Sequence, residues 1–249
     1  MAYSPGFLVA ILACACALSA LAARDLAEDH SIVARHEQWM SRYRRVYSDD
    51  AEKARRLDVF KANVAFIESV NSGTDKFWLE ANQFADISED EFRATYTGYK
   101  APVGGKKGKT TGFKYANVSL DALPASVDWR TKGAVTPIKD QGQCGYEDVP
   151  ANDEASLQKA VAAQPVSIGL DGGDNLFRFY KGGILSGDCG TELDHSIVAV
   201  GYGMASDGTK YWVMKNSWGT SWGEKGFIRM EREEQGLCGL AMQPSYPTA

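Results

Sequence analysis

The chain has 249 residues, of which 44% are hydrophobic and 24% are charged, which is enough for one large or two small globular domains. The formal net charge is −5 and the sequence pI is near 5.3. A mildly acidic chain of this kind is a poor candidate for nucleic-acid binding.

The first 23 residues have the pattern of a cleaved signal peptide. Phe7 to Leu21 is apolar and uncharged, and Ala20-Leu21-Ala22 fits a small-x-small cleavage site. This apolar run is shorter than the roughly 20 residues that a membrane-spanning helix needs. We therefore expect residues 1–23 to be removed, no membrane partner, and passage through the oxidising secretory pathway.

The cysteine count is odd once that segment is removed. Cys14 and Cys16 leave with the signal peptide, and Cys144, Cys189 and Cys238 remain. An odd count in a secreted protein leaves one thiol without a partner. Three scattered histidines and no paired-cysteine spacing also offer no tetrahedral metal site, so we expect no metal and no cofactor.

Residues 24–99 are charged and have helical periodicity. The first predicted helix has an apolar face made of Trp39, Met40, Tyr43 and Val46. Ser48 and Asp49 are candidate N-caps of a second helix that runs to about Val70 and ends at Gly73. The apolar face of this second helix consists of Val59, Phe60, Val64 and Ile67.

Residues 100–122 have the composition of an exposed linker, with Pro and Gly breakers, several lysines and the glycosylation sequon Asn117-Val118-Ser119. From Leu123 onward, glycine, aromatic residues and β-type runs increase. The predicted elements are a helix over Ala155–Ala163 and strands over Val166–Leu170, Ser196–Tyr202, Lys210–Lys215 and Gly226–Met230. The expected class is α+β, with an Asp207-Gly208 hairpin turn.

Two motifs in the helical region identify a resemblance. The second helix carries Glu, Arg, Phe, Asn, Ile and Asn at spacings of 4, 4, 3, 4 and 4, as in papain-type propeptides. Asn82, Phe84 and Asp86 match three of four positions of the second propeptide motif, where Glu80 replaces the usual glycine. The six residues of the first motif are Glu52, Arg56, Phe60, Asn63, Ile67 and Asn71.

Residues 123–249 resemble the peptidase domain of the papain family of cysteine proteases. The segment Leu123 to Arg130 resembles a mature amino terminus, and segments 140–145, 193–195 and 215–219 resemble the approaches to the catalytic residues. The resemblance, nearest to plant senescence-associated members, implies that His195 exchanges the proton of a cysteine thiol and forms an ion pair with the resulting thiolate. It also implies that Asn216 orients the imidazole, that Trp218 shields their contact, and that Gln141 holds the oxyanion.

The nucleophile itself is missing. The family motif C-G-[SA]-C-[WY] is replaced by Cys144-Gly145-Tyr146-Glu147-Asp148, so Glu147 stands at the nucleophile position and cannot form a thioester. Only a shift of the loop would let Cys144 act. His195 follows Cys144 by 51 residues, whereas the family spacing is roughly 130–150, so about 80–100 residues are absent. We place the break between Gly145 and Tyr146.

Further expectations follow from the resemblance. It implies a disulfide between Cys189 and Cys238, and a specificity pocket lined by Gly169 and Ser196 whose opposite wall is lost. The expected fold is a helical inhibitor-type propeptide followed by a truncated papain-like domain (123–249) that retains mainly the antiparallel sheet domain. Expected partners are peptide or protein substrates and the chain's own propeptide, and the family location is a vacuole, a lysosome or the cell exterior.

Three hypotheses remain open on the sequence alone. The chain is an incomplete record of an intact protease, or a real and inert product, or a non-functional transcript. An inert product could still act through its propeptide on related cysteine proteases. Loss of one domain should also expose an apolar face of the other, which would favour aggregation.

Overall fold

The computed structural model describes residues 31–100, 112–134, 145–232 and 236–248. Gln141 and Cys144, both singled out above, lie outside these residues. The chain divides into two compact units, residues 1–62 and 63–249, and each is described by itself. Within the described residues, no helix is long and apolar enough to cross a membrane.

The first unit is a helical pair with an aromatic core. A helix spans residues 31–43, and α2 (Asp50–Gly73) begins in this unit. The His36 ring contacts those of Trp39 and Phe60, with ring centroids 5.9 and 5.0 Å away, and Trp39 and Phe60 also contact each other. The predicted N-cap is present, because Asp49 Oδ1 accepts a hydrogen bond from the Glu52 amide. The placement of Val46 was wrong: it follows the helix and is 89% exposed.

The second unit begins with the remainder of α2, and the two asparagines of its motif bind the segment that follows. Asn63 Nδ2 donates to the carbonyls of Ala85 and Ile87, at 2.9 and 3.2 Å. Asn71 makes a two-way pair with the backbone of Leu79 in β1 (Phe77–Leu79). The motif spacing therefore places both amides where they hold β1 and the turn that follows it against the helix.

A short helix, α3 (Glu89–Tyr96), follows that segment. Its N-terminus is fixed by a capping box, in which Ser88 and Glu91 each accept the other's backbone amide. Phe92 is its buried residue and packs on Phe84, with ring centroids 5.0 Å apart. The sequence after residue 111 continues through a turn over 114–117 and η1 (Leu120–Ala122).

Residues 123–249, here called the β-rich half, contain strands β2 to β9 of a mostly antiparallel sheet, which confirms the predicted α+β class. Within the described residues the strand order is β1-β5-β8-β7-β6-β4-β9-β3, and β2 pairs separately with β6. The β5–β8 pair is parallel and the other pairs are antiparallel. The strands not yet given bounds are β2 (Val127–Asp128), β3 (Gly145–Asp148), β4 (Val166–Leu170), β5 (Tyr180–Leu185), β6 (His195–Met204), β7 (Lys210–Lys215), β8 (Phe227–Glu231) and β9 (Ser245–Thr248).

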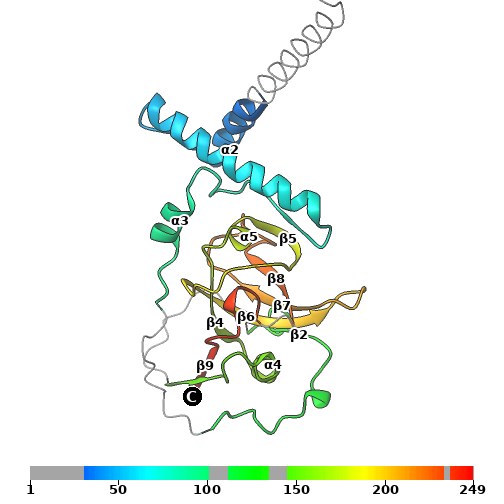
Figure 1. Ribbon diagram of the computed structural model, residues 1–249. Helices are drawn as coiled ribbons and strands as arrows, with labels where there is room; N and C mark the ends of the chain where they lie inside the picture. Colours follow the sequence, from blue (N-terminus) through cyan, green and yellow to red (C-terminus); the bar gives the residue numbers. More distant parts are fainter. Residues whose placement is uncertain (1–30, 101–111, 135–144, 233–235, 249) are drawn as a thin grey trace, which may run out of the picture. The chain divides into compact units, whose positions relative to one another are not determined.

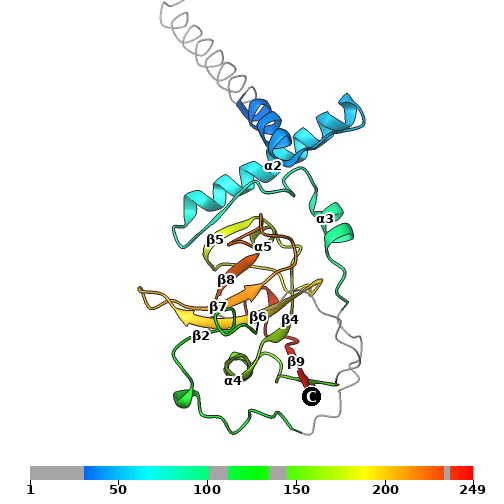
Figure 2. The same cartoon turned by 180° about the vertical axis from the view of Figure 1, so that it is seen from behind.

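Short helices complete this half. Helix α4 (Glu154–Ala163) packs on β6, as both views show (Figures 1 and 2). Helix α5 (Asn175–Arg178) lies near the start of β6, since its Phe177 ring is 6.3 Å from that of His195. The short helix η2 (Leu237–Gly239) lies near the end of β4. The predicted hairpin turn is present between β6 and β7, where Gly208 has φ +90° and Ala205 donates to Thr209.

The sheet sets the positions of the candidate site residues. His195 is the first residue of β6 and pairs with Leu170, the last residue of β4. Asn216 directly follows β7, the other neighbour of β6. Two residues that are 21 apart in sequence are therefore brought together at one end of adjacent strands.

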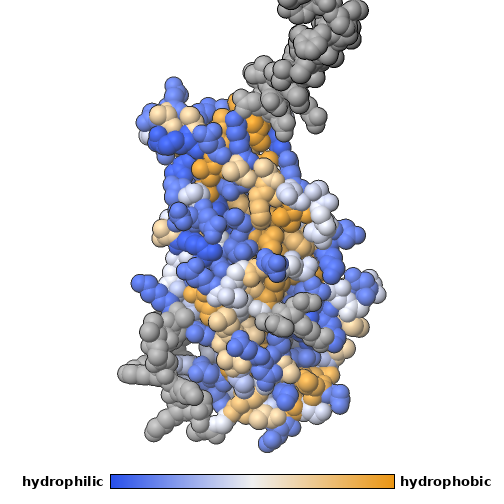
Figure 3. Space-filling model, in the orientation of Figure 1, coloured by the Kyte–Doolittle hydropathy of each residue, from blue (hydrophilic) through white to orange (hydrophobic). Residues whose placement is uncertain are grey.

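The surface carries apolar side chains as well as charged ones. On the face in Figure 3, hydrophobic residues form a band among hydrophilic ones. Large apolar side chains that are at least about one-third exposed in the second unit are Trp78, Tyr96, Leu120, Tyr146, Met204 and Met242.

Candidate active site

The centre of the candidate site is a buried histidine–asparagine pair. His195 is 7% exposed and Asn216 is 8% exposed, and His195 Nε2 lies 2.8 Å from Asn216 Oδ1. The amide of Ser217 donates to the same Oδ1 atom at 2.7 Å, which identifies it as the oxygen of the side chain. His195 Nε2 must then donate, so Nδ1 is the acceptor of the neutral ring.

The environment of His195 favours its neutral form. Burial lowers the pKa of His195 from its ordinary value, whereas the hydrogen bond to Asn216 and the charge of Asp194 oppose that shift. Trp218 stacks on the imidazole with ring centroids 4.6 Å apart. On another side, a Cβ atom added to Gly172 would lie 2.4 Å from His195 Cβ. Close packing therefore fixes the ring in one orientation.

Asn216 is held by its backbone as well as by its side chain. Its amide donates to the carbonyl of Gly226 at 2.9 Å. Its Nδ2 atom is buried and makes no hydrogen bond to any described residue. The amide oxygen alone thus holds the imidazole, which is the arrangement needed to fix one tautomer and leave Nδ1 for proton exchange.

Glu147, the residue at the nucleophile position of the motif, lies elsewhere. It is in β3, which is separated from β6 by β9 and β4. Its Oε2 accepts a hydrogen bond from Tyr246 at 2.6 Å, and its Oε1 accepts one from the Lys114 amide. Burial and the hydrogen bond to Glu147 raise the pKa of the Tyr246 phenol. Glu147 therefore has no role at His195.

The two residues predicted to line the specificity pocket face each other across β4 and β6. Gly169 and Ser196 are register partners, and Gly169 is covered by Tyr99, whose Cε1 would lie 3.1 Å from an added Cβ. The Tyr99 hydroxyl donates to Gln243 Oε1 at 2.9 Å. The segment that precedes the linker therefore lies over Gly169.

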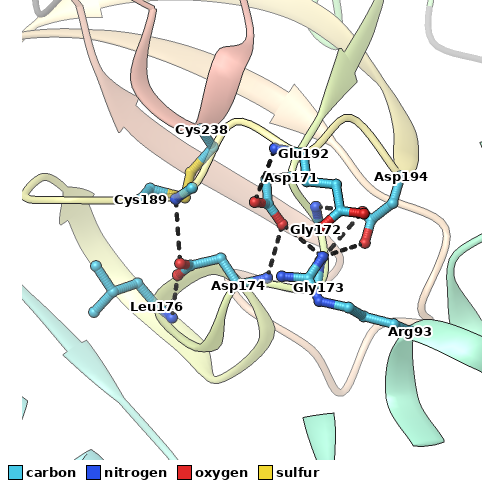
Figure 4. The surroundings of a disulfide bond; sticks show 11 residues. Arg93, Asp171, Gly172, Gly173, Asp174, Leu176, Cys189, Glu192, Asp194 and Cys238 are labelled. Carbon is cyan, nitrogen blue, oxygen red and sulfur yellow. Dashed lines mark hydrogen bonds and ion pairs between the residues drawn. A yellow bond between two sulfur atoms is a disulfide. The ribbon is translucent and has the colours of Figure 1, made fainter. Parts of the chain in front are cut away.

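A cluster of charged groups beside His195 was not predicted from the sequence. Arg93 of α3 lies between Asp171 and Asp194, at 3.0 and 2.6 Å (Figure 4). Burial opposes the charge of Arg93, but the two aspartates raise its pKa overall. Asp194 immediately precedes His195, and its Oδ1 accepts the amide of Gly172 at 2.8 Å.

A second residue missed in the sequence is Arg178 of α5, which is fully buried. The only signal was a charge inside the aromatic run Phe177-Arg178-Phe179-Tyr180. Its partners, like those of Arg93, are distant in sequence and could not be inferred from local pattern.

A disulfide joins Cys189 and Cys238, the pair expected by resemblance (Figure 4). The Cys238 carbonyl accepts a hydrogen bond from the Asp171 amide at 2.9 Å. The disulfide therefore ties the carboxyl-terminal segment to the loop that carries Asp194, and the hydrogen bond ties it to the loop that begins at Asp171. No group of three or more possible metal ligands is present among the described residues.

Two family models match the chain. Residues 123–146 and 145–248 match the papain family cysteine protease model in two segments. Residues 36–92 match the cathepsin propeptide inhibitor domain. The two peptidase segments meet at residues 145 and 146, which is where the sequence placed the break.

Relatives and solved structures agree with these matches. The chain is 49% identical over 340 aligned positions to senescence-specific cysteine protease SAG39 of Oryza sativa subsp. indica, and each chain is covered completely. It is 38% identical to senescence-specific cysteine protease SAG12 of Arabidopsis thaliana, with 96% of each chain covered. The difference between 340 aligned positions and 249 residues leaves at least 91 positions that this chain does not fill.

The proform of the ragweed pollen cysteine protease Amb a 11 is similar in structure, with a TM-score of 0.78, 29% identity, and 90% of this chain and 94% of that chain covered. Proform structures of this kind support the packing of the propeptide on the peptidase region. This chain belongs to the papain family of cysteine proteases and has the form of a proprotein with an inhibitor propeptide and an internally shortened peptidase domain.

Proposed function

We propose that the chain is a catalytically inert proform that retains the proton-transfer half of a cysteine protease site and lacks the nucleophile. The observation that carries this proposal is the environment of the His195–Asn216 pair. Among the described residues, which do not include 135–144, the groups placed against His195 are the Asn216 amide, the rings of Trp218 and Phe177, and the backbone at Gly172. None of these can attack a carbonyl.

In the family reaction, the thiolate sulfur forms a bond to the scissile carbonyl carbon, and the imidazolium gives its proton to the leaving amine. Here Nδ1 of His195 is available to exchange that proton, and Asn216 fixes the ring. Gln141 is the proposed oxyanion donor. Without a thiolate the first bond does not form, so the remaining groups have no acyl-enzyme to release.

Cys144 is a poor replacement for the nucleophile. Its neighbour Gly145 pairs with Thr248, whereas His195 pairs with Leu170. The register places Gly145 three strands across and about six residues along from His195, a separation on the order of 20 Å for ordinary strand spacings. Cys144 is one peptide unit from Gly145, about 3.8 Å, so we do not expect its thiol to reach the imidazole.

Labelling with an epoxide that is opened by activated cysteine thiolates tests this proposal. Cys144 is the one cysteine of residues 24–249 outside the disulfide. We expect it to react no faster than a free cysteine peptide, as followed by intact mass, and we expect His195→Ala to leave that rate unchanged. Fast labelling of Cys144 that is lost in His195→Ala would overturn the proposal.

The remaining assignments are also proposals. Residues 1–23 act as a signal peptide, residues 24–99 form the propeptide and residues 100–122 link it to the peptidase region. Passage through the secretory pathway, to a vacuole, a lysosome or the cell exterior, is supported by the apolar leader and by the disulfide.

A second candidate function is inhibition of related cysteine proteases by the propeptide. The match of residues 36–92 to an inhibitor domain favours it. Added to the mature form of the rice relative, the chain would then reduce its hydrolysis of a peptide substrate. We expect this inhibition to be weak in the intact chain, in which the propeptide packs on its own peptidase region.

A further inference from the structure

The propeptide segment from Lys76 to Tyr99, here called the arm, docks on a surface that the shortened peptidase domain still contains. Strand β1 of the arm pairs antiparallel with β5, with Phe77 opposite Gly183 and Trp78 opposite Gly182. Gly183 has φ +91°, and a Cβ atom there would lie 2.3 Å from the Lys76 carbonyl. The glycine therefore allows close approach of the arm backbone.

Arg178 binds the next part of the arm. Its Nη2 donates to the carbonyl of Phe84 at 2.6 Å and also to that of Ile87. The guanidinium lies 4.7 Å from the Phe92 ring centroid and 4.5 Å from that of Phe179. Its own carbonyl accepts a hydrogen bond from Asn82 Nδ2 at 2.8 Å. One residue of α5 thus contacts the arm through both its side chain and its backbone.

The arm and the β-rich half carry complementary charges at this surface. Asp86, Glu89 and Glu91 of the arm all act electrostatically on Arg178. In the opposite direction, Arg93 of the arm inserts between Asp171 and Asp194, whose side chains are 3% and 14% exposed (Figure 4). Arg93 thus forms ion pairs with the β-rich half, and Arg178 lies within the electrostatic influence of the arm's carboxylates, which favours one docking register.

The arm also covers the candidate active site. Phe84 and Phe92 each contact Trp218 edge-on, with ring centroids 5.6 and 5.2 Å away, and Trp218 stacks on His195. The amides of Gly98 and Tyr99 donate to the Asp194 carbonyl at 2.9 and 2.8 Å. The surface that the arm would use to cover another protease is occupied within its own chain.

We propose that the β-rich half sequesters the arm in cis, with Arg178 as the residue that fixes it, so that the chain is a self-capped inhibitor of related cysteine proteases. This proposal rests on the inert proform described above, since an active chain would remove its own arm. Release of the arm exposes its inhibitory face, and the partner that this face fits is the corresponding half of an active relative.

The test compares full-length chains as inhibitors of the mature rice relative, with a fluorogenic peptide as substrate. The variant Arg178→Met removes the donors and the charge, keeps an unbranched side chain between Phe92 and Phe179, and leaves the arm sequence unchanged. Because charge-assisted hydrogen bonds are strong, we expect inhibition about tenfold tighter or better than that of the unmodified chain. Gly182→Val is a second variant that should weaken docking of the arm without changing Arg178. A Cβ atom at this position would lie 2.5 Å from the Trp78 ring of β1.

Arg130→Met is the matched control, since Arg130 contacts Asp128 and Phe227 and not the arm. Hydrogen exchange at the amides of Glu80, Gly98 and Tyr99 reports release of the arm directly, and exchange in β6 and β7 shows that the β-rich half remains folded. For both test variants we expect faster amide exchange in the arm and unchanged exchange in β6 and β7. For the control we expect no change in either region.

Three results would overturn the proposal: equal inhibition by the unmodified chain and both variants, unchanged exchange in the arm of Arg178→Met, or released arms that fail to inhibit. Hydrolysis of the peptide before the rice relative is added would instead contradict the inert proform, so the two failures are distinguishable.

Discussion

Loss of the Cys189–Cys238 disulfide should destabilise the β-rich half strongly. The two cysteines are 49 residues apart in sequence. In the chain-entropy description, closing a loop of this length removes about 4 kcal/mol of conformational entropy from the unfolded state at 25 °C. Measured effects are typically about 2–4 kcal/mol, a large part of the roughly 5–15 kcal/mol that stabilises an ordinary domain.

The perturbation is a chain with Cys189→Ser and Cys238→Ser, unfolded in urea and followed by tryptophan fluorescence. With a denaturant slope near 2 kcal/mol per M, we expect the midpoint to fall by about 1–2 M. Cys144→Ser is the control, because Cys144 lies outside the disulfide, and its midpoint should not change. If the double variant has an unchanged urea midpoint, the disulfide does not stabilise the β-rich half by closing this loop.

Three further predictions concern single side chains. His195 should titrate below its ordinary pKa in histidine NMR. Since the folded chain then binds fewer protons than the unfolded chain, its stability should fall as the pH decreases below about 6.5, and a rise would contradict the burial argument. Gly172→Ala should cost about 1–3 kcal/mol of unfolding free energy, since its Cβ would lie 2.4 Å from His195 Cβ, whereas Gly98→Ala, with open space around it, should not. Asn71→Ala should speed amide exchange at Leu79 by removing a two-way pair worth about 1–2 kcal/mol, and the exposed Asn117→Ala should have no such effect.

The sequence correctly predicted the helices and strands whose determining residues lie close together along the chain. The strands over Val166–Leu170 and Lys210–Lys215 have the predicted bounds, and α4 begins one residue before its predicted start. The long helix was also predicted, because its apolar residues and its cap lie within a few turns of one another. Val46 was misplaced because it continues the apolar spacing after the chain has left the helix.

Contacts between distant segments were not predictable in the same way. Strand β1 has three residues and forms because β5 is available to pair with it. Arg93 finds its aspartates 78 and 101 residues away, and Arg178 finds its carbonyls 94 and 91 residues away. No periodicity marks such partners. His195 and Asn216 were identified only because their flanking motifs resemble a known family.

The asparagines of the propeptide motif show what the structure adds to a resemblance. The spacing alone gave Asn63 and Asn71 a family position and no physical role. Their side-chain amides bind backbone groups of residues 79–87. Each asparagine therefore satisfies backbone polar groups in the segment that follows the helix. Substitution at either position should therefore affect the arm before it affects the helix.

The central claim is that this chain carries a protease site without a nucleophile. The most direct measurement is peptide hydrolysis by the purified chain from residue 24, assayed at acid and neutral pH before and after cleavage of the linker, with the mature rice relative as the positive control. We expect no hydrolysis above that of a His195→Ala variant under any of these conditions. Turnover that a thiol reagent abolishes, and that His195→Ala lacks, would contradict it.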